Sequence, residues 1–180
     1  MPIIAKDPGT TDFEPAPEGF HPAICVDVVD LGNVETSWGT THQVQIRWQL
    51  DGHSDAGLRN DGKQWLVSRK YKLSLHDKAE LRKALVAWRG KQFTPEELNG
   101  FDVEKVVGSA CMIQVLHGKS RDGQRTFANV QTITPLPKGM EKPVASDYVR
   151  VKDRDTATTP TGGQPQGWDG PEEPVEEPDW

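Results

Sequence analysis

The sequence has only two cysteines, no long apolar run and no leader-like start. Cys25 and Cys111 lie in apolar, strand-like stretches without a CxxC partner or a neighbouring His and Cys cluster. This spacing suggests neither a zinc site nor a disulfide framework, and we expect both thiols to be reduced and buried. No segment approaches the length of a membrane span, and the N-terminus lacks the charged and apolar parts of a signal peptide. We therefore expect a soluble, cytoplasmic protein without a membrane partner.

Recognisable catalytic motifs are also missing. The five histidines are scattered, and there is no GxxxxGK[ST] loop, GxSxG elbow or HExxH helix. Asp27 and Asp30 come closest to a nuclease metal pair, but they fall on opposite faces of a predicted strand and have no third carboxylate nearby. We expect no catalytic residue, no metal and no cofactor, and hence no enzyme.

Basic residues are absent from the last twenty positions, which hold six acids. The other 160 residues carry 21 acids and 21 bases, so the whole net charge of −6 belongs to this tail. An acidic pI of about 5.4 for the whole chain would argue against nucleic-acid binding. Because the excess of acidic residues is confined to the tail, the acidic pI does not argue against nucleic-acid binding by residues 1–160.

The stretch 63–91 is predicted to form a strand followed by a helix. It contains nine Lys and Arg residues but only two acidic residues. Trp65, Tyr71 and Trp88 are interleaved with these cations. Cations can neutralise phosphates, and exposed rings can stack on unpaired bases. A solvated amphipathic strand and helix is the alternative interpretation of such a run.

Hydrophobic alternation predicts strands over 20–31, 41–50, 64–73, 109–117 and 125–133. In the third of these the alternation is blurred, which indicates a bulge or strong twist. Asp122-Gly123 predicts a hairpin between the last two strands.

Two helices are predicted between the third and fourth strands. Ser74 followed by Asp77 resembles a capping box, and Leu81, Leu85 and Trp88 form one apolar stripe that ends at Gly90. A short second helix is expected from Thr94 as N-cap to about residue 99.

Three strands, a helix and two strands form the element order of an OB-fold, a mainly β, five-stranded Greek-key barrel with one helix between strands 3 and 4. Another small antiparallel barrel or sandwich is the second choice. The predicted organisation is a flexible N-terminal arm (1–17), an OB-fold single-stranded DNA-binding domain (18–144), and a disordered linker with an acidic C-terminal tail (145–180).

OB-folds bind single strands across strands 2 and 3 and with the loops joining strands 1 to 2 and 4 to 5. Trp48, Trp88 and Phe127 are expected in the core, whereas the pattern leaves Trp38, Trp65 and Tyr71 open between core and base stacking. The candidate DNA-binding residues are Trp38, Arg47, Trp65, Arg69, Lys70, Tyr71, Lys72, Lys119, Arg121 and Arg125.

The chain ends in GWDGPEEPVEEPDW, an acidic segment with an aromatic last residue. Acidic tails often only solubilise. An aromatic residue at the end of an acidic segment can also be held by a partner with a basic rim and a hydrophobic pocket. The candidate partner-binding residues are Glu176, Glu177, Asp179 and Trp180.

The chain resembles the single-stranded DNA-binding proteins of tailed phages. The resemblance rests on WLVSRKYKLSLHDKAELRKALVAWRGKQFTPEELNGFD, on TITPLPKG, and on the TGGQPQGWDG linker before the acidic tail. It implies binding and protection of single-stranded DNA without strong sequence preference during phage DNA replication or recombination, in the host cell cytoplasm. It further implies that the tail recruits replication and recombination proteins and competes with DNA, with Trp180 where relatives generally have Phe.

Homo-oligomerisation stays open at this point, as do two other functions. One is an RNA-binding OB module. The other is a protein-interaction or inhibitor module that binds no nucleic acid.

Overall fold

A five-stranded antiparallel sheet makes up most of the computed structural model, which describes residues 14–157. The mainly β prediction is therefore confirmed. The strands are β1 (Gly19–Thr36), β2 (Gly39–Leu50), β3 (Leu66–Lys72), β4 (Ala110–Lys119) and β5 (Thr126–Thr134). The helices are α1 (Glu80–Arg89), α2 (Pro95–Asn99), the 3-10 helix η1 (Val103–Val106) and α3 (Val151–Ala157).

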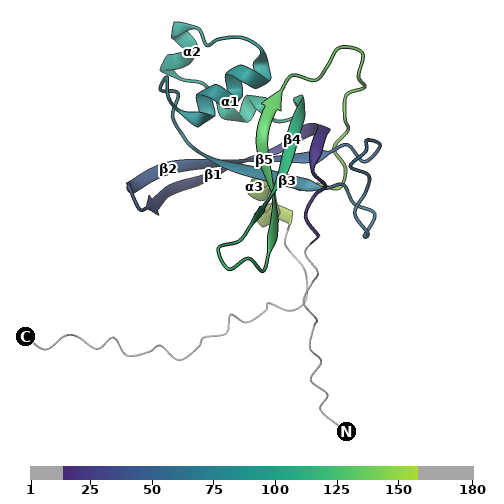
Figure 1. Cartoon of the computed structure of the whole chain (residues 1–180). Helices are drawn as coiled ribbons and strands as arrows, with labels where there is room; N and C mark the ends of the chain where they lie inside the picture. The colour runs from purple at the N-terminus through teal and green to yellow at the C-terminus, as the bar shows by residue number, and fades with distance from the viewer. Residues whose placement is uncertain (1–13, 158–180) are drawn as a thin grey trace, which may run out of the picture.

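The strand order in the sheet is β3-β2-β1-β4-β5, with the long β1 in the centre. Residues Gly19 to Ile24 of β1 pair with β4, while Ala23 to Thr36 pair with β2. Register shifts between Cys25 and Asp27 and between Asp30 and Gly32 interrupt the β1–β2 ladder. Such bulges bend a strand and increase its twist, and Figure 1 shows strands of the sheet crossing at steep angles. No ladder joins β3 to β5 in the described part of the chain, so these two strands are the edges.

The predicted apolar stripe of α1 is confirmed, because Leu81, Leu85 and Trp88 are all buried. Gly90 ends the helix in the left-handed conformation, with φ of 69°. The start of α1 was predicted too early: the helix begins at Glu80, and its N-cap is Ala79 rather than Ser74. Thr94 is the N-cap of α2 as predicted, and it forms a capping box with Glu97.

The core lies between the concave face of the sheet and α1 (Figure 1). Trp48 is fully buried, and its ring centroid lies 6.0 Å from that of Trp88, so both core predictions hold. Cys25 and Cys111 are free and buried, as expected. Burial raises the pKa of Cys25 to about 12, which keeps the thiol protonated at neutral pH.

The sequence predicts a bulge or a strong twist in the third strand. The bulge is wrong, because β3 pairs with β2 in unbroken register. The blurred alternation has another cause. Arg69 shares its face of β3 with the buried residues Val67 and Tyr71 and reaches across to β5. Its Nη1 donates to the carbonyl oxygens of Val130 and Gln131, at 3.1 and 3.3 Å. An inward arginine thus bridges the two edge strands.

The boundary predicted at residue 145 is corrected by the structure. Residues 144–151, here called the strap, run along the sheet instead of starting a linker, and α3 follows them (Figure 1). Gln49 on β2 exchanges two hydrogen bonds with the backbone of Ser146. At the other end of the domain, Ala16 of the predicted arm is buried. The tail residues Glu176, Glu177, Asp179 and Trp180 lie outside the described residues.

A buried carboxylate holds the strap in place. Asp27 on β1 is 1% exposed and accepts hydrogen bonds from the Tyr148 hydroxyl (2.9 Å), Arg150 Nε (3.1 Å) and the Val151 amide (2.8 Å). Burial alone would raise the pKa of Asp27, but these donors outweigh it and hold the pKa below its usual value. The carboxylate is therefore ionised and fully paired at neutral pH.

The strap anchor can be tested by replacing Asp27 with alanine. The change leaves Arg150 without its buried partner, so we expect the free energy of unfolding to fall by about 3 kcal/mol. Urea denaturation of the full chain measures this loss, and limited proteolysis at 144–157 shows whether the strap is released. Asp30→Ala is the matched control, because Asp30 lies three residues away but is exposed. Equal, small effects of the two substitutions would contradict the anchoring role of Asp27.

Candidate nucleic-acid interface

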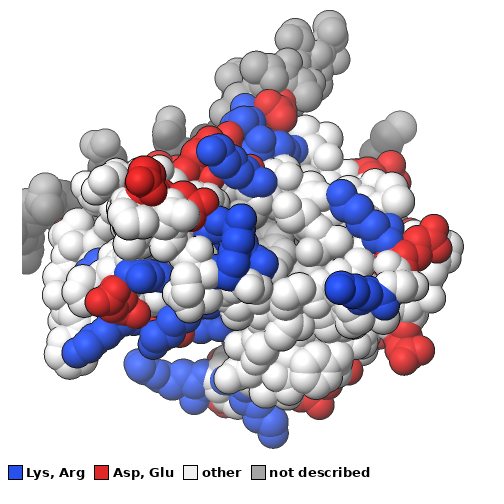
Figure 2. All heavy atoms as spheres, turned by 90° about the horizontal axis from the view of Figure 1, so that it is seen from above, with Lys and Arg blue, Asp and Glu red and all other residues white. Residues whose placement is uncertain are grey.

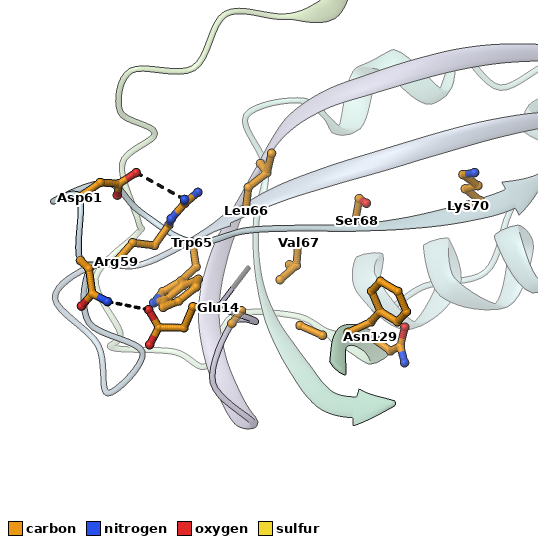
Figure 3. A pocket seen from close by; sticks show the side chains of 13 residues that line it. Glu14, Arg59, Asp61, Trp65, Leu66, Val67, Ser68, Lys70 and Asn129 are labelled. Carbon is orange, nitrogen blue, oxygen red and sulfur yellow. Dashed lines mark hydrogen bonds and ion pairs between the residues drawn. The ribbon is translucent and has the colours of Figure 1, made fainter. Parts of the chain in front are cut away.

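A cleft of about 750 Å³ opens between the edge strands β3 and β5. The segment before β1 and the loop 51–65 close one end of it, and Figure 3 shows Trp65, Leu66, Ser68 and Lys70 following one another along its β3 side. The lining residues are Glu14, Ala16, Arg59, Asn60, Asp61, Trp65, Leu66, Val67, Ser68, Lys70, Phe127, Ala128 and Asn129.

The two ends of this β3–β5 cleft differ in charge. At the loop end Arg59 forms an ion pair with Asp61 at 3.4 Å, and Asn60 donates to Glu14 (Figure 3). At the opposite end Lys70 is exposed and forms no ion pair within the described residues. An anionic ligand is therefore favoured at the Lys70 end, where no carboxylate lines the cleft.

The β4–β5 hairpin continues the basic surface from the Lys70 end. A second hollow is lined by Ser120, Arg121, Asp122, Arg125 and Phe127. Asp122 is engaged by the Ser120 hydroxyl and the Gln124 amide, which lower the pKa of its carboxyl. The two arginines form no ion pair within residues 14–157.

Phe127 lines both hollows and so joins them. Its side chain is 42% exposed, which corrects the prediction that it lies in the core. The signal was present in the sequence: on β5 Phe127 alternates in phase with Asn129 and Gln131, whereas Ala128 and Val130 face inward. An exposed ring between Lys70 on one side and Arg121 and Arg125 on the other is suited to stack on a base while the cations hold phosphates.

Five of the predicted DNA-binding cations are exposed, and none of them forms an ion pair among the described side chains. Figure 2 shows the face seen from the helix side, where Lys and Arg are spread from the centre to the edges and acidic side chains lie among them. The five exposed cations are Lys70 and Lys72 on β3 and Lys119, Arg121 and Arg125 at the β4–β5 hairpin.

The other two predicted cations are committed to structural contacts. Arg69 bridges β3 and β5, and its Cζ lies 5.1 Å from the ring centroid of Tyr71. Arg47 donates to Gln45 and to the Tyr148 hydroxyl beneath the strap. Both guanidinium groups therefore already have partners within the fold, unlike the five exposed cations.

Two of the predicted stacking rings lie in the core. Tyr71 is 3% exposed, and its burial raises the pKa of its hydroxyl to about 12. Trp65 is 7% exposed and donates from Nε1 to the Ala56 carbonyl at 3.1 Å. Trp65 contributes to the wall of the cleft, but a base cannot cover a ring that the protein already covers.

The third ring, Trp38, is 94% exposed at the turn between β1 and β2. It lines neither of the two hollows that share Phe127. Phe127 therefore takes the position in the basic surface that the sequence suggested for the three other rings.

Among residues 14–157 no three His, Cys, Asp or Glu side chains are grouped in a way that could hold a metal ion. The same residues contain no helix long and apolar enough to cross a membrane. No protein-family model and no curated protein matches the chain.

The positions of the rings can be tested by their effect on stability. Trp65→Ala removes a buried ring with a satisfied indole, so we expect the free energy of unfolding to fall by about 3–5 kcal/mol. Phe127→Ala removes an exposed ring and is expected to change it by about 0.5 kcal/mol or less. Guanidinium denaturation compares the two variants. A large loss for Phe127→Ala would mean that this ring packs in the core after all.

Proposed function

We propose that the chain binds single-stranded DNA without strong sequence preference and performs no catalysis. The observation that carries the proposal is the exposed Phe127 ring, which lies between the basic edge of the β3–β5 cleft and the basic β4–β5 hairpin. A single strand could place phosphates on Lys70, Arg121 and Arg125 and a base on the ring. A duplex offers no unstacked base to this site, so binding should favour single strands.

We also propose that the sheet is an OB-fold barrel. Three features support this finer assignment. The strand β1 pairs with both β2 and β4, α1 lies between β3 and β4 in the chain, and Arg69 draws the edges β3 and β5 together. In OB-folds the loop between strands 4 and 5 is one of the binding loops. Here that loop carries Arg121 and Arg125, and Lys119 is the last residue of β4 before it.

The proposal includes a biological role. The resemblance to phage single-stranded DNA-binding proteins suggests that the protein protects single strands during phage DNA replication or recombination in the host cytoplasm. The acidic tail, with Glu176, Glu177, Asp179 and Trp180, would recruit partner proteins. RNA remains the competing ligand, since phosphates and ring faces are common to both nucleic acids.

The stacking role of Phe127 can be measured with a fluorescently labelled oligo-dT titrated with the full chain and followed by polarisation. We expect Phe127→Ala to weaken binding by about 1–3 kcal/mol, the value of one base–aromatic stack. Lys70→Gln should lower the slope of log K against log salt by about 0.7, because one phosphate contact is lost.

Phe20→Ala and Lys91→Gln are the matched controls, since both residues are exposed and neither lines the two hollows. Duplex DNA and an oligo-U of the same length complete the set. Equal affinity for duplex DNA and single-stranded DNA would contradict the proposal. Tighter binding to oligo-U would assign the interface to RNA.

A further inference from the structure

The β1–β2 hairpin extends beyond the rest of the sheet. The ladder with β3 ends where Gln43 pairs with Lys72, and the ladder with β4 ends at Ile24. Apart from a hydrogen bond from the Leu73 amide to the His42 carbonyl, residues 33–42 are paired only with each other, and Figure 1 shows the two strands projecting from the body of the domain. Trp38 lies at the tip of this extension with 94% of its surface exposed. An exposed tryptophan on a projecting arm is typical of a contact residue.

The charge of the extension does not suit nucleic acid. No Lys or Arg occurs from residue 29 to residue 46, while Asp30 and Glu35 are both present and exposed. The arm's one histidine, His42, already has a partner, because its Nε2 lies 2.5 Å from the carboxylate of Asp30 at the base of the arm. A DNA strand on Trp38 would bring its phosphates to an acidic arm. A hydrophobic pocket with a basic rim is the better complement to this residue.

The domain carries such a pocket on another part of its surface. A hollow of about 380 Å³ lies between the end of α1, η1 and the start of β4, and its walls are mostly apolar. Two cations, Arg89 and Lys105, stand among the lining residues. Arg89 is paired with Glu97, but Lys105 is exposed and makes no ion pair within the described residues. The lining residues are Trp88, Arg89, Phe101, Lys105, Val106, Ser109, Ala110, Pro135 and Leu136.

We propose that the Trp38 arm of one copy of this chain docks in the Trp88–Leu136 pocket of a second copy. The indole would fill the apolar hollow, and Glu35 would face Lys105 at its rim. Arm and pocket are different surfaces of one molecule, so each copy offers both a donor arm and an acceptor pocket. Such a heterologous contact repeats from copy to copy instead of closing in a symmetric dimer.

The contact is small, because only the tip of the arm enters the pocket. Interfaces well below about 1,000 Å² are weak and transient. A single DNA strand that binds two copies side by side would raise their effective concentration, so that even this weak contact would be occupied. The arm would then give cooperative coverage of long strands, a consequence that goes beyond binding itself.

The arm can be tested on the full chain without DNA, by sedimentation at increasing protein concentration. We expect concentration-dependent association that Trp38→Ala weakens about 30-fold, the effect of truncating a hot-spot tryptophan. Phe20→Ala, which removes another exposed ring, should leave the association unchanged. Glu35→Lys and Lys105→Glu should each weaken it, and the protein with both changes should associate like the wild type.

Mixing two variants tests the heterologous geometry. Trp38→Ala keeps its pocket, while Leu136→Asp keeps its arm and places a carboxylate in the pocket. Each should be monomeric alone, and the mixture should form 1:1 heterodimers and nothing larger. Failure of the mixture to associate would overturn the proposal.

Three other outcomes would also overturn it. The first is wild-type protein that stays monomeric, and the second is association that Trp38→Ala leaves intact. The third is association that is lost when residues 158–180 are deleted, because the tail rather than the Trp38 arm would then occupy the pocket. Binding of Trp38→Ala to an oligonucleotide long enough for one copy reports separately on the DNA site: unchanged affinity is expected, and a loss would make Trp38 a base-stacking residue.

Discussion

The bridge made by Arg69 is the contact on which the proposed binding surface depends. Edge strands normally expose unpaired backbone groups, and here the carbonyl oxygens of Val130 and Gln131 on β5 accept from a guanidinium that starts on β3. The same guanidinium lies over the ring of Tyr71 and 3.7 Å from Glu80 at the start of α1. One side chain therefore sets the approach of β3 and β5, and with it the distance between Lys70 on one edge and Phe127 on the other.

The strap determines which surface remains for a ligand. It covers the polar face of β1 and β2 and occupies Arg47 and Gln49, which the alternation of β2 leaves facing solvent. Its anchor, Asp27, would be costly to bury alone, but three donors surround it, and Arg150 is paired with Glu104 as well. With this face covered, the basic surface that stays open runs along the edge of β3 and the β4–β5 hairpin. The projecting Trp38 arm lies apart from both.

The sequence predicts the local elements well and the long-range contacts poorly. Alternation located all five strands, and the spacing of Leu81, Leu85 and Trp88 located α1, because these patterns depend on near neighbours. The strap escaped prediction since Asp27 and Tyr148 are 121 residues apart and no periodicity links them. The blurred alternation around Arg69 predicts a bulge or a strong twist, whereas this polar residue on an inward face marks a tertiary contact. Its residue type places Phe127 in the core, whereas its alternation in phase with the polar residues Asn129 and Gln131 indicates the exposed face of β5, where it lies.

The proposed path of single-stranded DNA over the protein is tested most directly by photo-crosslinking. The full chain would be bound to oligo-dT containing 5-bromouracil and the complex irradiated. The crosslinked peptides would then be mapped by mass spectrometry. We expect crosslinks to Phe127 and to neighbouring residues of the β3–β5 cleft and the β4–β5 hairpin. Crosslinks confined to the strap, or to the face of β2 that the strap covers, would contradict binding at this surface.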